Sequence, residues 1–305
     1  MKTMRALVSI VACALLCGCE SSEGPATSVA AAPAAPAAPA APPAEHQHET
    51  PAPTPAAEAA PEIPLLEQTV AYGEGARSNL VGYLAMPQDA AEPLPGIIVI
   101  HESWGLNDDI KALTRSLAGH GYVVLAVDLY GGKTAKTPEA ANALMGDLYA
   151  DPDAARRNLQ QGYAYLEKYA LAPRIATIGW DLGAGWSLQT AFEYPGALDA
   201  AVMYYGQVVT ARERLRPLNV PVLGFFGAED RSIPVREVQE FRAALADLGK
   251  NAEVLIVSRV GHGFAIPTGA GYNEKAANEA WEQTLKFLEQ NLKPDGDGHA
   301  VEDSA

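Results

Sequence analysis

The sequence predicts one α/β domain built on a mostly parallel β-sheet with helices on both faces. From Leu65 onward, short apolar runs alternate with helix-like segments, and these runs lack the apolar/polar alternation of a strand that faces water on one side. The links between successive segments are short, which leaves no room for a separate lid domain. We therefore expect a single domain over residues 64–293 with a rather open cleft.

The predicted strands come first as an antiparallel edge and then as a parallel core. The edge consists of the first two strands, and every later strand is a short run of mostly aliphatic residues that precedes a helical pattern or a turn. In chain order the predicted strands are Thr69–Tyr72, Leu80–Met86, Ile97–Ile100, Val123–Val127, Ile175–Ile178, Ala200–Tyr204, Val222–Phe226 and Val254–Val257.

The predicted helices lie between the core strands and after the last one. Their apolar residues recur with the spacing of one helix face, which is typical of helices that cover a sheet. In chain order they are Asp108–Ala118, Pro138–Tyr149, Asp153–Tyr169, Leu182–Glu193, Val235–Leu248 and Glu274–Asn291.

The N-terminus is typical of a bacterial lipoprotein precursor. Lys2 and Arg5 precede the apolar run Ala6–Leu16, which suits the core of an export signal and is too short for a permanent membrane helix. The run ends in Leu-Cys-Gly-Cys, which resembles a lipobox whose last residue, Cys19, becomes lipidated. Cys17 fits less well because Leu16 would then occupy a position that requires a small residue. We predict a signal peptide over residues 1–18 and a lipid anchor at Cys19.

Residues 19–63 are predicted to be the lipidated N-terminus followed by a linker. Ala and Pro dominate residues 24–62, and such a segment has almost nothing to bury. His46 and His48 lie on this tether without fixed geometry, so we expect no metal site and no other cofactor. Residues 294–305 are predicted to be a disordered tail.

The charge and the cysteine content of the chain limit which classes of binding partner and which cell compartment are expected. The net charge of -15 argues against nucleic acid or an anionic membrane surface as a partner, so the membrane is reached through the lipid anchor only. All three cysteines lie in the N-terminal segment, and the folded domain has neither a disulfide nor a catalytic thiol. We expect a bacterial cell-envelope protein that faces the periplasm or the exterior.

Residues able to do chemistry follow several of the predicted core strands. Because the carboxyl ends of parallel strands meet at one edge of the sheet, these residues should lie close together. The segments are His101-Glu102-Ser103-Trp104-Gly105, Gly179-Trp180-Asp181-Leu182-Gly183, Gly227-Ala228-Glu229-Asp230 and Val260-Gly261-His262-Gly263-Phe264. A nucleophile position, an acid and a histidine follow one another in the chain order of the α/β hydrolases, so the predicted fold is a single-domain α/β-hydrolase fold without a lid domain.

The central segment has the spacing of G-x-nucleophile-x-G, with Asp181 in the nucleophile position. The flanking glycines leave room for a sharp strand-to-helix turn, which pushes the central side chain out over the sheet. Ser or Cys is usual there. Asp181 is therefore either a different kind of nucleophile or a sign that the chemistry has been lost, with helix N-capping as its only role.

From about Leu80 to Leu292 the chain resembles the dienelactone hydrolase family. The resemblance rests on His101-Glu102-Ser103-Trp104-Gly105-Leu106, Asp128-Leu129-Tyr130-Gly131-Gly132, Ile178-Gly179-Trp180, Tyr204-Tyr205-Gly206, Gly227-Ala228-Glu229-Asp230 and Gly261-His262-Gly263-Phe264. It implies a hydrolase that cleaves lactones or small esters, with a Cys-His-Asp triad.

The resemblance assigns roles by position. It implies that Asp230 is the acid, His262 the base and Asp181 the residue in place of the nucleophile. The oxyanion hole would be the backbone N–H groups of Leu182 and Ser103. Two further residues are assigned to the substrate site: Glu102, matched to a family glutamate that lies against the nucleophile, and Trp104, for which a packing role is also open.

This chain departs from the family pattern at two positions. Asp181 replaces the family cysteine, and Ile266 stands where family members carry an arginine for the substrate carboxylate. A carboxylate that attacks an ester carbonyl leaves again more readily than an alkoxide, whereas attack on a saturated carbon gives a stable alkyl ester that water can hydrolyse. Asp181 could also act as a base for water.

The readings of function are thus three. The first is a hydrolase of a small ester, lactone or related small molecule, acting through an Asp-His-Asp site. The second is a silenced hydrolase-fold lipoprotein with a binding role, and the third is an enzyme with an aspartate nucleophile, similar to dehalogenases.

Overall fold

The structure is a computed structural model of the chain, and it describes residues 63–73, 79–267 and 269–293. The predicted signal peptide, Cys19, nearly all of the linker and the C-terminal tail lie outside the described residues. The described residues form the α/β domain that the sequence predicts, and none of their helices has the length and apolar character needed to cross a membrane.

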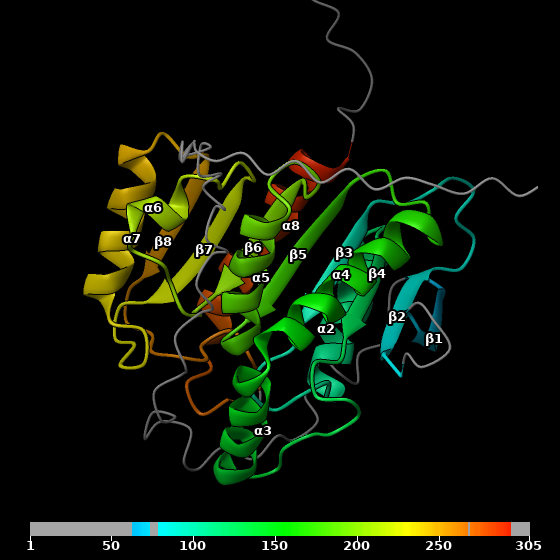
Figure 1. Ribbon diagram of the computed structural model, residues 1–305, viewed down its shortest axis with the longest axis horizontal. Coiled ribbons are helices and arrows are strands. Elements are labelled where there is room, and N and C mark those ends of the chain that lie inside the picture. The colour runs from blue at the N-terminus through cyan, green and yellow to red at the C-terminus, as the bar shows by residue number, and fades with distance from the viewer. Residues whose placement is uncertain (1–62, 74–78, 268, 294–305) are drawn as a thin grey trace, which may run out of the picture. The chain divides into compact units, whose positions relative to one another are not determined.

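One eight-stranded sheet organises the domain, in the order β1-β2-β4-β3-β5-β6-β7-β8 (Figure 1). β2 pairs antiparallel with β1 and with β4, and all the other neighbours pair parallel. The prediction of a parallel core with an antiparallel edge is therefore confirmed. The strands are β1 (Leu65–Ala71), β2 (Val81–Pro87), β3 (Gly96–Ile100), β4 (Val123–Val127), β5 (Ile175–Trp180), β6 (Ala200–Tyr204), β7 (Val222–Gly227) and β8 (Ala252–Val257).

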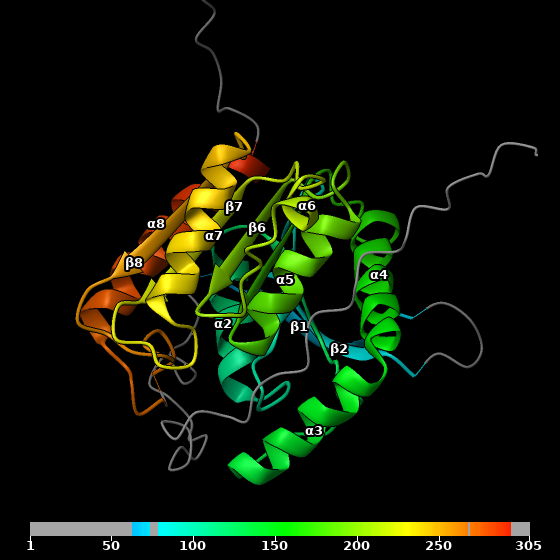
Figure 2. The same cartoon turned by 60° about the vertical axis from the view of Figure 1, so that its left-hand side comes forward.

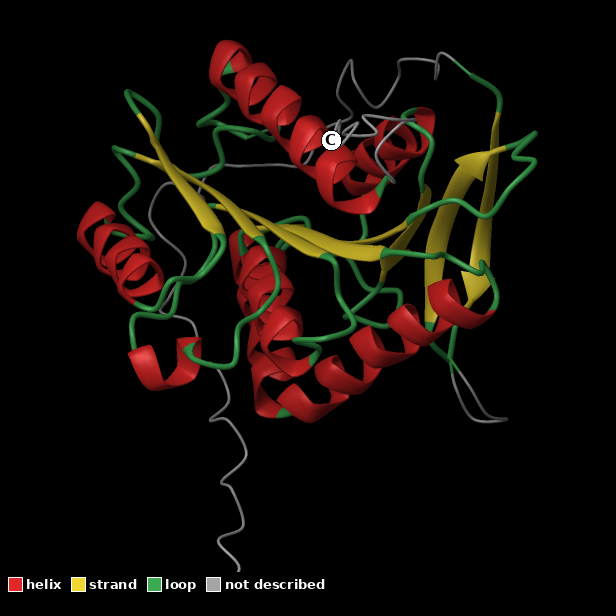
Figure 3. Cartoon of the chain, turned by 90° about the horizontal axis from the view of Figure 1, so that it is seen from above, coloured by secondary structure: helices red, strands yellow, loops and turns green. Residues whose placement is uncertain are grey.

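Helices cover both faces of this sheet (Figure 3). α2 and α8 pack on one face, and α4, α5 and α7 pack on the other. One short helix, α6, lies in a segment outside the predicted helices. The helices are α2 (Asp108–Gly119), α3 (Pro138–Ala150), α4 (Pro152–Lys168), α5 (Leu182–Glu193), α6 (Arg212–Leu215), α7 (Val235–Asp247) and α8 (Glu274–Leu292).

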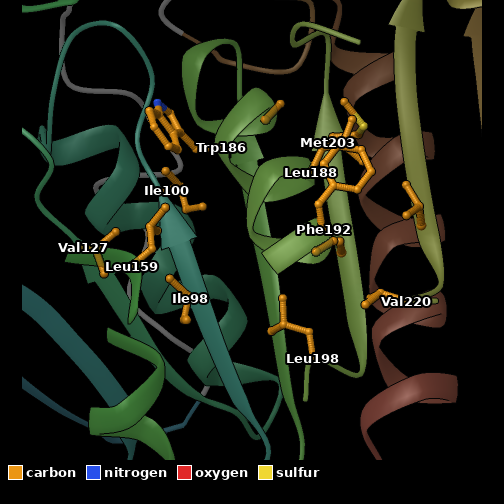
Figure 4. Close-up of a cluster of buried hydrophobic side chains, with 14 of the residues drawn as sticks. Ile98, Ile100, Val127, Leu159, Trp186, Leu188, Phe192, Leu198, Met203 and Val220 are labelled. Carbon is orange, nitrogen blue, oxygen red and sulfur yellow. The ribbon is translucent and has the colours of Figure 1, made fainter. Parts of the chain in front are cut away.

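The core is divided by the sheet into two apolar layers, because alternate side chains of a strand point to opposite faces. In β3, Ile98 and Ile100 pack with the helices α4 and α5, while Ile97 and Val99 pack with α2 and α8. Figure 4 shows side chains of the first of these layers, among them Ile98 and Ile100 of β3 and Trp186 of α5. Burial on both faces explains why the sequence of the core strands is continuously apolar.

Local sequence signals set where several helices begin. The side chains of Asn107, Thr137, Asp151 and Asn273 each accept a hydrogen bond from a backbone N–H in the first turn of the helix that follows. These contacts satisfy N–H groups that have no partner within the helix. α5 begins differently, at a turn whose shape is set by glycines.

α3 departs from the layered arrangement. It follows the β4 strand end and lies beyond the carboxyl ends of the central strands, where Figures 1 and 2 both show it projecting from the sheet. Its buried residues Ala141, Met145 and Leu148 face the domain. α3 thereby forms part of the wall at the edge of the sheet where the candidate site lies.

Candidate active site

Two glycines make the sharp turn between β5 and α5 possible. A Cβ atom on Gly179 would lie 2.2 Å from the backbone of Gly183, and a Cβ atom on Gly183 would lie 2.2 Å from the carbonyl oxygen of Ile100. No side chain fits at such distances, so the strand and the helix can approach each other only with glycine at both positions. The sequence pattern around Asp181 is thus explained by the shape of the turn.

Asp181 sits at the apex of this turn in an unusual backbone conformation. Its φ is 49° and its ψ is -114°, a region that non-glycine residues rarely adopt. It occupies the N-cap position of α5, yet its side chain makes no capping hydrogen bond. The structure therefore places Asp181 at the apex of the turn, without the side-chain contact of a helix cap.

His262 is held in place by Asp230, as the matched roles predict. The Nδ1 of His262 lies 2.9 Å from Oδ2 of Asp230, and the other oxygen of Asp230 accepts hydrogen bonds from the backbone N–H groups of Ser232 and Ile233. Both Asp230 and His262 are buried. The Asp230 carboxylate is thus fixed by the turn after β7 and orients the imidazole ring.

The opposite edge of the same ring faces Asp181. Nε2 of His262 lies 3.4 Å from Oδ1 of Asp181, whose side chain is 27% exposed. Burial alone would lower the pKa of His262, but the hydrogen bonds and charges of Asp181 and Asp230 outweigh burial and raise it to about 10. At neutral pH the imidazole is therefore protonated and the site is an imidazolium between two carboxylates.

The end of β3 forms a second wall and is tied to β4 through His101. The ring of His101 is fully buried, and burial lowers its pKa, so the ring is neutral. Its Nδ1–H donates to the carbonyl oxygen of Glu102 at 2.7 Å, while its Nε2 accepts from the N–H of Leu129 at 3.1 Å. This bridge fixes the path of the chain through Glu102 and Ser103.

The two backbone N–H groups assigned to an oxyanion hole are available. Ser103 follows β3 and Leu182 is the first residue of α5, and neither N–H donates to a turn, loop or side-chain acceptor among the described residues. Glu102 is buried at the same strand end. Contact between Glu102 and Asp181 stays a prediction.

Two other positions named by the sequence have packing environments. Trp104 is buried and packs with Ala135 and Ala141 at the base of α3. Ile266, at the position of the family arginine, is 4% exposed and belongs to the core layer on the α8 side. No cationic side chain therefore stands at the position that the family pattern gives to the carboxylate-binding arginine.

Two tyrosines that were not predicted as site residues lie close enough to Asp181 for its negative charge to affect their pKa values. Burial is the main reason why the pKa values of Tyr130 and Tyr149 are raised, and the negative charge of Asp181 is the next. The hydroxyl of Tyr130 is buried without a hydrogen-bond partner among the described residues. Tyr130 follows the β4 strand end, so the rule that chemistry collects at strand ends could have found it, whereas Tyr149 lies near the end of α3.

The structure brings Asp181, Asp230 and His262 together at one edge of the sheet. Comparisons with known proteins show what the chain is similar to. A sequence model of the dienelactone hydrolase family matches residues 80–292. A relative from Saccharolobus solfataricus, which carries the provisional name carboxymethylenebutenolidase, is 26% identical over 266 residues, covering 75% of this chain and 100% of that protein. A relative of the same name from Salmonella typhimurium is 29% identical over 237 residues, covering 70% of this chain and 83% of that relative.

Solved structures give the same picture. A crystal structure of a protein from Klebsiella pneumoniae, provisionally named a dienelactone hydrolase, superposes with a TM-score of 0.67 at 27% identity. That match covers 74% of this chain and 99% of the other.

Proposed function

Because the chain belongs to the dienelactone hydrolase family, and is a hydrolase by that membership, we propose that it hydrolyses a small ester, lactone or related small molecule with Asp181 as the nucleophile. The observation that carries this proposal is the contact between Asp181 and His262, 3.4 Å between Oδ1 and Nε2, at the apex of the turn. A carboxylate in an ion pair with an imidazolium is ionised and can attack.

The first step is attack of an Asp181 oxygen on a saturated carbon of the substrate. A bond forms between that oxygen and the carbon, and the bond from the carbon to its leaving group breaks, so that the leaving carboxylate, alkoxide or halide takes the electron pair. Attack at a carbonyl carbon is disfavoured, since Asp181 would be expelled again. The product of this step is an alkyl ester of Asp181.

Esterification changes the protonation of His262. The ester removes the negative charge of Asp181, one of the two partners that raise the pKa of His262, while burial continues to lower it. His262 then releases its proton to the leaving group or to water and becomes a base. The site thus produces its base only after the substrate has reacted.

The second step is hydrolysis of this ester at the Cγ atom of Asp181. Neutral His262 takes a proton from water as the water oxygen bonds to Cγ, and it returns the proton to the departing alcohol. The N–H groups of Ser103 and Leu182 would stabilise the oxyanion on Cγ. Asp181 then gives its own proton to His262, which restores the ion pair.

Oxygen labelling tests this mechanism directly. Excess protein is reacted once with a lactone, an epoxide or a 2-haloacid in ¹⁸O-water, and the peptide that contains Asp181 is analysed by mass spectrometry. A covalent ester predicts one labelled oxygen in Asp181, whereas a general-base role predicts none. Asp181→Asn should abolish turnover, and Asp147→Asn, an exposed change on α3, should leave it intact.

Other outcomes would select the other readings. Full activity of Asp181→Asn would rule out every mechanism that uses the carboxylate. A wild-type protein that is inert on the whole panel would favour a silenced hydrolase-fold lipoprotein.

We also propose that the precursor is exported and anchored by lipid at Cys19, which places the domain in a bacterial cell envelope. The support is the signal pattern and the lipobox-like residues that end in Cys19. Mass spectrometry of the mature N-terminus should find lipid on Cys19, and Cys19→Ser should release the protein from the membrane fraction. An unmodified Cys19 in the wild type would contradict this proposal.

A further inference from the structure

A cavity lies beside α5. It has a volume of about 220 Å³ and lies between α5 and the segment 207–214, with Tyr149 of α3 at its border. Asp181 is not among its lining residues. A space of this size holds a small organic molecule and not only water.

Two of the residues that line this cavity each carry a buried N–H donor without a hydrogen-bond partner among the described residues. The Nε atom of Arg214 and the Nε1 atom of Trp186 are both buried, and neither has a hydrogen-bond partner among the described residues. A buried donor without a hydrogen bond destabilises the fold, so an acceptor on a bound ligand would stabilise the protein. Both atoms are donors only, which points to an oxygen acceptor on the ligand.

The charge of Arg214 is also unbalanced within the part of the chain that the structure describes. No Asp or Glu lines the cavity, and no ion pair of Arg214 is found among the described residues. Arg156 behaves differently, because Asp153 and Glu193 both pair with it. The cavity therefore offers a positive charge to a ligand.

The remaining lining combines apolar side chains with the polar side chains of Gln189, Gln207 and Thr210. Its apolar part includes Leu188 and Phe192 of α5 and Val208 and Val209 of the segment 207–214. An inorganic anion would leave these side chains uncovered, whereas a short hydrocarbon would cover them. The lining therefore fits a ligand that is charged at one end and apolar along its body.

We propose that this cavity binds a small organic carboxylate, with its carboxylate on Arg214 and Trp186 and its hydrocarbon between α5 and the segment 207–214. This proposal does not rest on the hydrolysis proposed above, since the binding needs neither Asp181 nor turnover.

Calorimetric titration at low ionic strength tests the proposal with hexanoate, its neutral analogue hexanamide, and inorganic phosphate. Hexanoate should bind wild-type protein, while hexanamide lacks the charge and phosphate lacks the hydrocarbon. Arg214→Gln should weaken hexanoate binding by about tenfold or more, because a hydrogen-bonded charge is removed. Arg216→Gln, an exposed change next to the same helix, is the matched control and should leave affinity within about twofold.

Trp186→Phe provides a second variant that keeps an aromatic ring and removes only the N–H donor. It should weaken hexanoate binding by a few-fold, with unfolding temperature as the check that both variants fold. The proposal is overturned if hexanoate does not bind, if hexanamide or phosphate binds as tightly as hexanoate, or if Arg216→Gln weakens binding as much as Arg214→Gln.

Discussion

The imidazole of His262 lies against the carboxylate of Asp181, with 3.4 Å between Nε2 and Oδ1, at the position where family members carry a thiol. A catalytic thiolate and a carboxylate both carry a negative charge that stabilises a protonated histidine. Replacement of cysteine by aspartate therefore keeps the ion pair and changes what the anion can attack.

Removal of the Asp181 charge should lower the pKa of His262. We expect Asp181→Asn to move this pKa from about 10 toward or below that of an ordinary histidine, since the charged partner is lost and burial remains. An NMR titration of the imidazole nitrogens measures the change, with His262→Gln to identify the signals of His262 among those of the six histidines. An unchanged pKa would show that Asp181 does not act on the ring.

The raised pKa of His262 also predicts how stability depends on pH. The unfolded chain binds this proton with a pKa of about 6.5, and the folded chain with one of about 10. Folding therefore gains a contribution that is complete below about pH 6.5 and is lost as the pH rises through about 10. The free energy of unfolding of the wild type should fall between about pH 7 and 10.

Urea unfolding at several pH values measures this dependence. The fall should be less steep in His262→Gln, and it should be unchanged in the surface control His120→Gln. Equal slopes for wild type and His262→Gln would contradict the assigned protonation.

Asp181→Cys should produce an active thiol enzyme on activated esters. Asp230 already pairs with His262, and a thiol beside His262 would form the reactive thiolate. Release of p-nitrophenol from its acetate ester, measured against wild type and Asp181→Asn, reports the gain. Asp181→Cys with no more activity than Asp181→Asn would mean that the remaining residues are not arranged for acyl transfer.

Tyr130→Phe should separate catalysis from stability. Because the Tyr130 hydroxyl is buried without a partner among the described residues, its removal should change the free energy of unfolding by less than about 0.5 kcal/mol or increase it. If that hydroxyl donates to the leaving oxygen of the substrate, the same change should lower kcat by about tenfold or more. A loss of stability with unchanged kcat would assign Tyr130 to packing.

The turn itself should tolerate no side chain at Gly183. Gly183→Ala places a Cβ atom 2.2 Å from the carbonyl oxygen of Ile100, and we expect a loss of about 3 kcal/mol or more. Gly146→Ala in α3 is the matched control, because nothing lies within 4 Å of the added atom. That change should stabilise the protein by about 0.5 to 1 kcal/mol. Thermal unfolding of the two variants gives the comparison.

Much of the fold could be predicted because its determinants are local. The core strands are buried on both faces, so their apolar runs stand out, and the turn at Asp181 is marked by two glycines. Strand limits were less accurate at the edges: β1 begins at Leu65, four residues before the predicted start at Thr69. An exposed edge strand carries polar residues and has a weaker pattern.

The candidate site was predictable only where its residues follow strands. Asp181, Asp230 and His262 do so, and the order of the strands brings them together. Tyr149, by contrast, belongs to a helix whose placement depends on packing far along the chain. Helical periodicity indicates which face is buried, but it does not indicate what that face meets.

The backbone at Asp181 has a consequence for how this protein would respond to engineering. A non-glycine residue at φ 49° destabilises the fold by about 1–3 kcal/mol, and glycine adopts this conformation more easily. A library selected only for heat resistance should therefore accumulate glycine at position 181 and discard the carboxylate. Screens for more stable variants of this protein therefore need an activity readout from the first round. Otherwise selection for stability favours substitution of Asp181, the residue on which the proposed chemistry depends.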